Sequence, residues 1–414
     1  MFELRQEIFQ RGGYKAPGPD MIIGRVLKEC IDEVAPHLAS ETNACKDLGF
    51  SPRGWKVEDG VACAKPGKKD YTLMKAHRLL ALLCAASKIL EGMMTSRVSW
   101  RAERGSCFHE HTYGFRPDRN RDGAVEELVK RAEWAIHRGR VLVAVFFDMD
   151  GAFNQSWHPA VLTALQEKGC PPGLFCLISK FLWERQCNLN VNGFSASKLL
   201  RLGFPQGGNG PPIYWTTHND RLAVYVEVGG EAIFIGYADD NGFTVEGGPD
   251  ELGALVELAA RVLVSVKKQY RPLKINFSRD PEKMKAMSFT TCRDGQRGKD
   301  IALTFLGGVL DRKFTWASLI EACTKKAKQL AVAMTSCAWA KWGLGRRVVQ
   351  QIYKGAVEPI MLNGVAAWVA TLTKKGTMGR LRSVQRLTAL AMTGCFRTTS
   401  TTAALALAGL LPAE

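Results

Sequence analysis

Three aspartates stand where apolar segments of the chain end. Asp148 follows the continuous β-branched and aromatic run 141–147, and Asp239 and Asp240 lie much further along, between the apolar segments 232–235 and 242–245. A carboxylate at the mouth of a buried strand is costly unless it is paired or bound to a metal. Three carboxylates without a nearby His or Cys form an all-oxygen site, which suits Mg²⁺ or Mn²⁺ and not zinc.

Two divalent ions held by such carboxylates would support phosphoryl transfer, because they activate an attacking hydroxyl and stabilise the leaving oxygen. If the two strands are neighbours in a sheet, all three side chains meet at one edge. The plainer alternative is that Asp239 and Asp240 only cap a turn, which is common for paired aspartates. Taken together with a basic chain, the site favours a polymerase or a nuclease.

Periodicity predicts the elements that position these residues. The fold class is α+β, with strands and helices intermixed before a mainly helical, basic C-terminal part that begins near residue 318. Gly/Pro/Lys loops at 12–20 and 65–70 make the front of the chain irregular. The predicted elements are helices at 87–98, 125–136 (ended by Gly139), 213–226 and 252–266, a strand at 284–289, and hairpins around Asn192-Gly193 and the segment 237–240.

Composition limits the class of protein. The chain has 414 residues, is 46% hydrophobic and 23% charged, and carries a net charge of +16. These values exclude collagen-like and largely disordered chains. The positive charge favours a polyanionic partner, although a soluble protein that is simply basic fits the composition equally well.

The cysteines and the apolar runs exclude other classes. The 12 cysteines include no C-x-x-C pair, so neither a zinc ribbon nor a thioredoxin-type site is indicated. The alternation of Cys107, His109 and His111 is interpreted as a loop coincidence. No apolar run reaches membrane-spanning length and the first residues lack a signal-peptide core, which predicts a soluble intracellular protein with reduced thiols.

Several motifs resemble those of reverse transcriptases. F-x-D-x-x-G-A-F at 146–153, P-Q-G-G at 205–208 and Y-A-D-D at 237–240 resemble motifs A, B and C in order and separation. The flanking segments narrow the resemblance to the polymerase region of non-LTR retrotransposons, in particular the jockey-like group, and extend it over nearly the whole chain. These segments are APGPD at 16–20, KPGKKD at 65–70, YGFRPDRN at 113–120, WHPAVL at 157–162, FLGGVLDRKFTW at 305–316 and TTSTTAALALAGL at 398–410.

The resemblance implies a right-hand polymerase with fingers at 1–140, a palm with an antiparallel sheet and motifs A to E at 141–310, and a helical thumb with a C-terminal extension at 311–414. The implied activity is RNA-directed DNA polymerisation from a primer at a nicked target. The implied cofactor is Mg²⁺ (or Mn²⁺), and the implied partners are an RNA template, a DNA primer or target and dNTPs, without a membrane. Target-primed copying implies nuclear action, and the chain is expected to be part of a longer reading frame.

Carried over by position, the resemblance makes Asp148, Asp239 and Asp240 the catalytic metal ligands and places Tyr237 near the primer terminus. Phe153 matches the aromatic steric gate, whose ring occupies the space of a ribose 2′-hydroxyl and offers that hydroxyl no partner. The alternative is that Phe153 is an ordinary core residue at a strand end.

Further residues match nucleotide-binding and proton-transfer positions. Gln206 and Gly207 lie in the motif B loop, where glycine allows the backbone to approach template and nucleotide. Lys65 and Arg78 match the residues that neutralise the triphosphate, although each could equally be a solvated surface charge. Lys283 matches the motif D lysine that protonates the departing pyrophosphate, and Lys285 is near enough to exchange roles with it.

Two departures from the family pattern leave other functions open. Arg78 begins R-L-L-A-L where relatives usually carry R-P-I-S-L, and Asn154 replaces the aspartate that commonly follows the motif A aromatic. Neither change removes a metal ligand. The alternatives are a partly decayed RNA-binding protein with little activity and an intron-encoded maturase type of reverse transcriptase.

Overall fold

The computed structural model describes residues 1–191, 193–278, 283–290, 303–306, 308–310, 316–337, 344–373 and 375–412. The chain divides into two compact units, which are described separately. The first comprises Met1–Arg119, Phe147–Phe243 and Ala259–Met284, and the second comprises Asn120–Phe146, Thr244–Leu258 and Lys285–Glu414. The predicted boundaries at residues 140 and 310 divide the chain differently and stay predictions.

The first unit contains the elements that carry the motifs. Its helices are α1 (Phe2–Gln10), α2 (Gly24–Glu29), α3 (Ile31–Leu48), α4 (Ala85–Arg104), α6 (Ala152–Gln155), α7 (His158–Glu167), α8 (Pro172–Leu182), α9 (Gly210–Asn219) and α10 (Arg221–Glu227). Its strands are β1 (Val57–Ala64), β2 (His77–Leu83), β4 (Arg185–Val191), β5 (Phe194–Leu200), β6 (Ala232–Tyr237) and β8 (Asn276–Phe277). Three elements cross from one unit to the other, namely β3 (Val141–Asp150), β7 (Asp240–Gly247) and α11 (Leu252–Tyr270).

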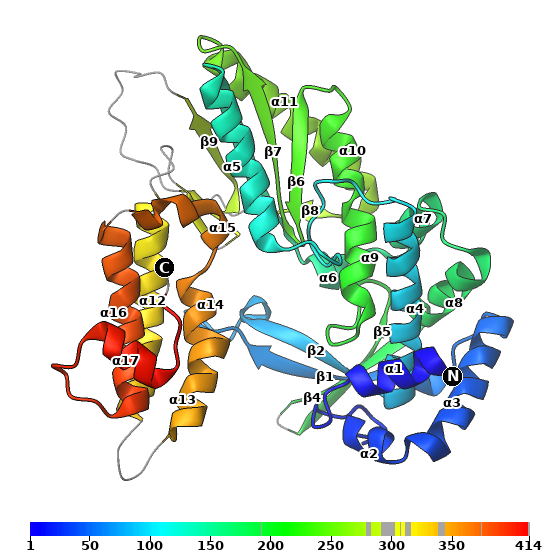
Figure 1. The fold of residues 1–414 in the computed structure, drawn as a ribbon. Helices are drawn as coiled ribbons and strands as arrows, with labels where there is room; N and C mark the ends of the chain where they lie inside the picture. The colour runs from blue at the N-terminus through cyan, green and yellow to red at the C-terminus, as the bar shows by residue number, and fades with distance from the viewer. Residues whose placement is uncertain are drawn as a thin grey trace. The chain divides into compact units, whose positions relative to one another are not determined.

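The second unit is mainly helical after its short strands. Its strands are β9 (Lys285–Phe289), β10 (Leu303–Phe305) and β11 (Gly308–Leu310). Its helices are α5 (Arg121–His137), α12 (Ala317–Ser336), α13 (Arg346–Ile352), α14 (Glu358–Met361), α15 (Val365–Trp368), α16 (Lys375–Thr393) and α17 (Thr401–Ala408). Helix α16 packs against both α12 and α17 (Figure 1). This part confirms the predicted helical character of the C-terminal segment.

Two sheets organise the strands of the motifs. One has the order β2-β1-β4-β5, in which β1 pairs antiparallel with β2 and parallel with β4. The other has the order β6-β7-β3-β8, and β9 also pairs with β3. Strand β3 is buried at its first seven residues, as expected for a β-branched and aromatic run that is covered on both faces. The strands that carry Asp148 and Asp240, β3 and β7, are neighbours in this sheet.

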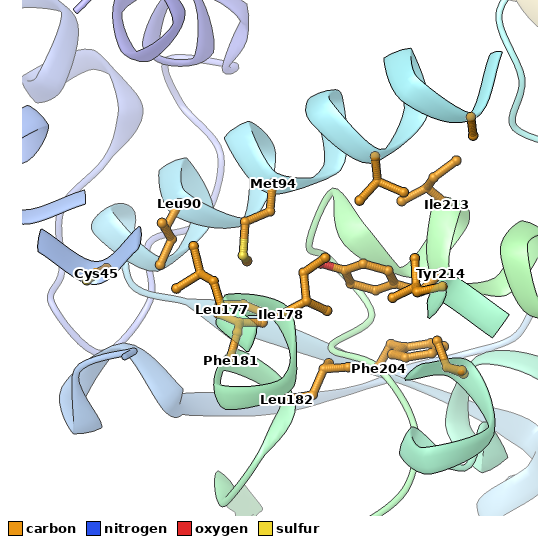
Figure 2. Packing of buried hydrophobic residues seen from close by; sticks show 14 of the residues in the cluster. Cys45, Leu90, Met94, Leu177, Ile178, Phe181, Leu182, Phe204, Ile213 and Tyr214 are labelled. Carbon is orange, nitrogen blue, oxygen red and sulfur yellow. The ribbon is translucent and has the colours of Figure 1, made fainter. Parts of the chain in front are cut away.

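A large apolar cluster supports the first unit. It joins α4 and α8 to the start of α9, and Figure 2 shows Met94, Ile178, Phe181 and Tyr214 facing one another within it. Ile178, Phe181 and Tyr214 are fully buried. Burying one such side chain stabilises the fold by about 1.5–3 kcal/mol. The cluster therefore stabilises the helices from which the motif-bearing loops extend.

Several sequence predictions are confirmed and two need correction. The segment 213–226 is not one helix, because α9 and α10 are separate elements with Asp220 between them. The front of the chain is more regular than expected, since α1, α2 and α3 precede β1. Within the described ranges, no helix is both long and apolar enough to cross a bilayer. The α+β class is confirmed.

Candidate active site

The three aspartates reach the same end of two neighbouring strands. Asp148 lies in β3, two residues before its end, whereas Asp240 begins β7 and Asp239 lies in the turn that precedes it. Because β7 and β3 are adjacent, the sheet brings the carboxylates from distant parts of the chain to one edge. Asp148 is half-buried, and Asp239 and Asp240 are exposed.

The carboxylates influence one another electrostatically. Reduced hydration among the surrounding protein atoms, followed by repulsion from Asp239 and Asp148, raises the pKa of Asp240 to about 6. The pKa of Asp239 is raised for the same two reasons, with Asp148 as the repelling charge. Lys283 donates from Nζ to Asp148 Oδ2 and partly offsets both increases. The sheet edge therefore carries excess negative charge that a cation would relieve.

The donor set fits a hard divalent ion. All three side chains offer carboxylate oxygens, the ligands that Mg²⁺ prefers. Burial first, and repulsion between carboxylates second, raise the pKa of Asp239 and Asp240. Lys283 Nζ supplies the positive charge at Asp148. Across the part of the chain that the structure describes, no three His, Cys, Asp or Glu side chains are already arranged to hold a metal ion. The Lys283 ammonium and a divalent ion would compete for the Asp148 carboxylate.

The turn that carries Asp239 has a constrained backbone. Ala238 has a φ of +58°, a left-handed conformation that costs a non-glycine residue about 1–2 kcal/mol. Its carbonyl oxygen accepts a 2.9 Å hydrogen bond from Trp215 Nε1 and a 3.3 Å bond from Asn219 Nδ2. Asn241 Nδ2 donates to the carbonyl oxygen of Asp239 at 3.0 Å. Helix α9 thus holds the turn in place.

A loop before α5 supports the same turn from another side. Tyr113 N donates to Gly236 O at 2.8 Å, and Thr216 Oγ1 donates to Gly114 O at 3.1 Å. A Cβ on Gly114 would overlap the backbone nitrogen of Ala238, so only glycine allows this approach. The close contact between these two backbones therefore explains why the Y-G-F-R segment has glycine at position 114.

The predicted steric gate, Phe153, lies directly after strand β3. It occupies the short helix α6, is half-buried, and packs against the apolar cluster of the first unit. Its ring centroid is 6.1 Å from that of Phe115 and 6.2 Å from that of Trp215. Its backbone oxygen accepts from Phe204 N at 2.8 Å, just before the motif B loop.

The motif B loop contacts strand β2. Ala81 N donates to Gln206 O at 2.6 Å, and Gly207 is exposed with a φ of +135°. Glu91 of α4 lies beneath this loop, where its Oε2 accepts from Asn209 N at 2.9 Å. The Glu91 carboxylate also fills the space that a side chain on Gly208 would need. The loop is therefore fixed from two sides.

Glu91 is a fully buried carboxylate, and burial raises its pKa to about 7. The charge of Arg185 and the hydrogen bond from Asn209 N offset part of this increase. Its position next to the first turn of α9 is favourable for a negative charge, because unpaired N–H groups point out of a helix N-terminus.

The remaining predicted residues lie in several places. Tyr237 is half-buried at the end of β6, next to the turn. Lys65 follows β1 and donates from Nζ to Lys75 O at 3.0 Å, and Arg78 is exposed on β2. Lys285 belongs to β9 and is paired with Phe146 in the strand register. Of the two motif D candidates, Lys283 is thus the one that contacts an aspartate of the site.

The segment with Cys107, His109 and His111 has a local structural role. His109 N donates to Asp220 Oδ1 at 2.9 Å, and His109 Nε2 lies 3.1 Å from Glu227 Oε2. The two histidine rings are 5.4 Å apart. These contacts tie the loop to α10.

Sequence reasoning missed Trp215, Phe115 and Glu91. Trp215 and Glu91 lie on helices α9 and α4, where the apolar periodicity predicts that a position is buried but not which partner it contacts. The left-handed φ of Phe115, +58°, has no signal in the residue type, since phenylalanine rarely adopts it. A buried glutamate on an apolar helix face was a possible signal for Glu91, because such a group needs a partner.

The sequence matches a known family and known proteins. The family described as reverse transcriptase (RNA-dependent DNA polymerase) matches residues 65–308, more than half of the chain. The RNA-directed DNA polymerase from the mobile element jockey of Drosophila melanogaster is 26% identical, with 92% of this chain and 42% of that protein covered. The putative 115 kDa protein in the type-1 retrotransposable element R1DM of Drosophila melanogaster is 27% identical, with 100% and 40% covered. The chain therefore spans less than half the length of these relatives.

Among solved structures, the telomerase of Candida albicans in complex with a fragment of telomeric RNA is 9% identical, with a TM-score of 0.47 and 86% of this chain and 62% of that chain covered. The curated matches confirm the resemblance to non-LTR elements of the jockey-like group. The family match includes all three aspartates and the motif B loop. The chain belongs to the reverse transcriptase (RNA-dependent DNA polymerase) family.

Proposed function

We propose that this chain is the polymerase region of a non-LTR retrotransposon reverse transcriptase, which adds dNTPs to a DNA primer on an RNA template. One observation carries the proposal. Asp148, Asp239 and Asp240 lie at one edge of a sheet, repel one another, and have Lys283 as a neighbouring cation. The net charge of +16 supports a nucleic-acid substrate, because phosphate neutralisation dominates such binding.

Reverse transcriptases generally use divalent metals, and we propose Mg²⁺ (or Mn²⁺) here. When bound, the ions would lower the pKa of the primer 3′-hydroxyl and stabilise the leaving oxygen. Asp148, Asp239 and Asp240 would hold them. Lys283 would leave Asp148 and donate a proton from Nζ to the departing pyrophosphate, with Lys285 as the less favoured donor because its strand pairs with Phe146.

The surrounding residues would bind the substrates. Phe153 would exclude the ribose 2′-hydroxyl, and Tyr237 would lie at the primer terminus. Gln206 and Gly207 would contact the template and the incoming nucleotide. The hydrogen bond from Ala81 N to Gln206 O supports this role, because it holds their loop in place.

Two basic residues of the β1–β2 hairpin would neutralise the triphosphate. These are Lys65 and Arg78, and the exposure of Arg78 leaves its guanidinium accessible. By position in the family pattern, the hairpin belongs to the fingers at 1–140, followed by the palm at 141–310 and the thumb at 311–414. We propose that the protein works in the nucleus during target-primed copying.

The alternative, a partly decayed RNA-binding protein with little activity, is less well supported. The chain retains all three carboxylates together with the Lys283 contact. The Asn154 departure lies on an exposed residue of α6 and not on a carboxylate of the site.

Primer extension tests the proposal. The chain is incubated with poly(rA)/oligo(dT), dTTP and Mg²⁺ or Mn²⁺, and compared with Asp239→Asn and with Asp47→Asn, an exposed aspartate of α3. We expect extension by the wild type and Asp47→Asn and none by Asp239→Asn. RNA binding without extension in all three proteins would support the RNA-binding alternative instead.

A further inference from the structure

The ring of Phe115 lies beside the predicted steric gate. Its centroid is 6.1 Å from that of Phe153 with the planes at 63°, an edge-to-face pair. Phe153 also contacts Trp215, at 6.2 Å and 55°. The Phe153 ring is therefore bounded by one aromatic ring from α9 and one from the loop before α5.

Trp215 and Phe115 each connect to the aspartate turn. Trp215 Nε1 donates to Ala238 O, and Gly114, the residue before Phe115, lies directly against Ala238 N. The contacts form a closed path that runs from Ala238 through Trp215, Phe153, Phe115 and Gly114 back to Ala238. The position of the Phe153 ring is thereby linked to the position of the turn that carries Asp239.

The backbone of Phe115 is held in an unfavourable conformation. Its φ is +58°, and such a value persists in a bulky residue only when its surroundings enforce it. The next residue, Arg116, supplies that enforcement: its guanidinium contacts both carboxylate oxygens of Glu103 at 2.8 Å and donates to His109 O and Thr112 O.

Core packing alone does not account for this residue. Phe115 remains 41% exposed although its backbone is strained. A ring that leaves so much surface in water contributes little burial free energy to set against that strain. What the conformation achieves is contact between the exposed ring and Phe153.

We propose that Phe115 is a specificity-determining residue, a brace that keeps the Phe153 ring where it excludes ribonucleotides. The inference rests on the proposed function and adds to it a second residue for sugar selection. Phe115 acts through Phe153 and is a positioning residue. Without the brace the Phe153 ring gains freedom to turn aside, so ribonucleotides enter more readily while deoxynucleotides are still accepted.

The test compares insertion of dGTP and GTP opposite a single templating cytosine in RNA by the whole chain. Phe115→Ala keeps a Cβ at the strained position and removes only the ring, and Phe115→Tyr retains the ring. Phe9→Ala removes an exposed ring from α1 and serves as the matched control. Thermal melting of every variant checks that it is folded, and Phe115→Leu replaces Phe115→Ala if the latter does not fold.

We expect the GTP/dGTP ratio of kcat/KM to rise about two- to tenfold in Phe115→Ala, the range that corresponds to one aromatic pair contact. Phe115→Tyr and Phe9→Ala should keep the wild-type ratio. In Phe153→Val, adding Phe115→Ala should cause no further rise, because the brace then has nothing to hold.

Each other outcome has a distinct meaning. If Phe153→Val changes the ratio and folded Phe115→Ala does not, the brace is refuted while the gate remains. An equal loss of dGTP and GTP insertion in Phe115→Ala also refutes the brace, since it indicates a general structural role. If the wild type does not extend primers, the proposed function fails and the inference fails with it.

Discussion

Trp215 Nε1 donates a 2.9 Å hydrogen bond to the carbonyl oxygen of Ala238, so a buried indole on α9 holds the turn between β6 and β7. Trp215 is fully buried, and the carbonyl also accepts from Asn219 Nδ2 at 3.3 Å. The turn that carries Asp239 is therefore positioned by the helix that follows the motif B loop.

Trp215→Phe should destabilise the turn. It removes the indole donor while retaining an aromatic ring, and weakening a buried hydrogen bond costs about 1–3 kcal/mol. We expect a lower melting temperature and slower primer extension. Trp183→Phe, at an exposed tryptophan, is the control and should leave both unchanged. Equal effects of the two substitutions would argue against a role for the hydrogen bond.

The effect of a substitution at Ala238 on stability should depend on how well the new residue adopts the left-handed φ of the turn. Ala238→Gly removes the steric strain but adds freedom to the unfolded chain, so the two effects of about 1 kcal/mol nearly cancel. Ala238→Val places a β-branched side chain at φ +58° and should lower the melting temperature. The same change at Ala62, exposed in β1, should be tolerated. A tolerated Ala238→Val would contradict the strained turn.

Phe153→Val should admit ribonucleotides. The smaller side chain vacates the space that a 2′-hydroxyl needs, so the rate of GTP insertion should rise relative to that of dGTP. Competition between the two nucleotides in primer extension measures the change, with Phe9→Val as the control. Unchanged sugar selectivity in folded Phe153→Val would show that Phe153 is a core residue and not a gate.

Lys283→Gln should slow nucleotide addition more than Lys285→Gln. Loss of a general acid typically costs about 100-fold or more. Among the contacts of the described residues, Lys283 pairs with Asp148, whereas Lys285 lies opposite Phe146 in the strand register. Single-turnover extension measures the rate, and the two substitutions are matched in charge and size. A larger effect of Lys285→Gln would reverse the assignment.

Glu91→Gln should change how stability depends on pH. Burial raises the folded-state pKa of Glu91 from 4.5 to about 7, so the folded chain binds this proton more tightly than the unfolded chain does. The contribution of the protonated Glu91 carboxyl to the free energy of unfolding is fully present below about pH 4.5 and is lost as pH rises through about 7. Glutamine keeps an oxygen for Asn209 N but does not ionise.

The melting temperature of Glu91→Gln should therefore rise relative to the wild type between pH 4.5 and 7. Glu41→Gln, at an exposed residue of α3, is the control and should show no such trend. A difference between Glu91→Gln and wild type that stays constant over this range would mean that Glu91 does not titrate there.

Local patterns predicted the strand with Asp148, the hairpin tip with Asp239 and Asp240, and helices α4 and α5. These succeeded because their apolar periods and turn residues are properties of short segments. The break between α9 and α10 at Asp220 was missed, because Asp220 makes its bonds with His109 N and Thr112 Oγ1 from far away in the sequence. Trp215 and Phe115 were missed for the same reason, since their partners come from other elements.

Lys283 gives Asp148 a positive neighbour that belongs to the chain itself. Its ammonium offsets part of the repulsion among the carboxylates at this sheet edge without any bound ion. If the edge holds metal as proposed, an arriving ion would compete with a cation that the protein already supplies, so the affinity for the ion would depend on how readily Lys283 leaves Asp148.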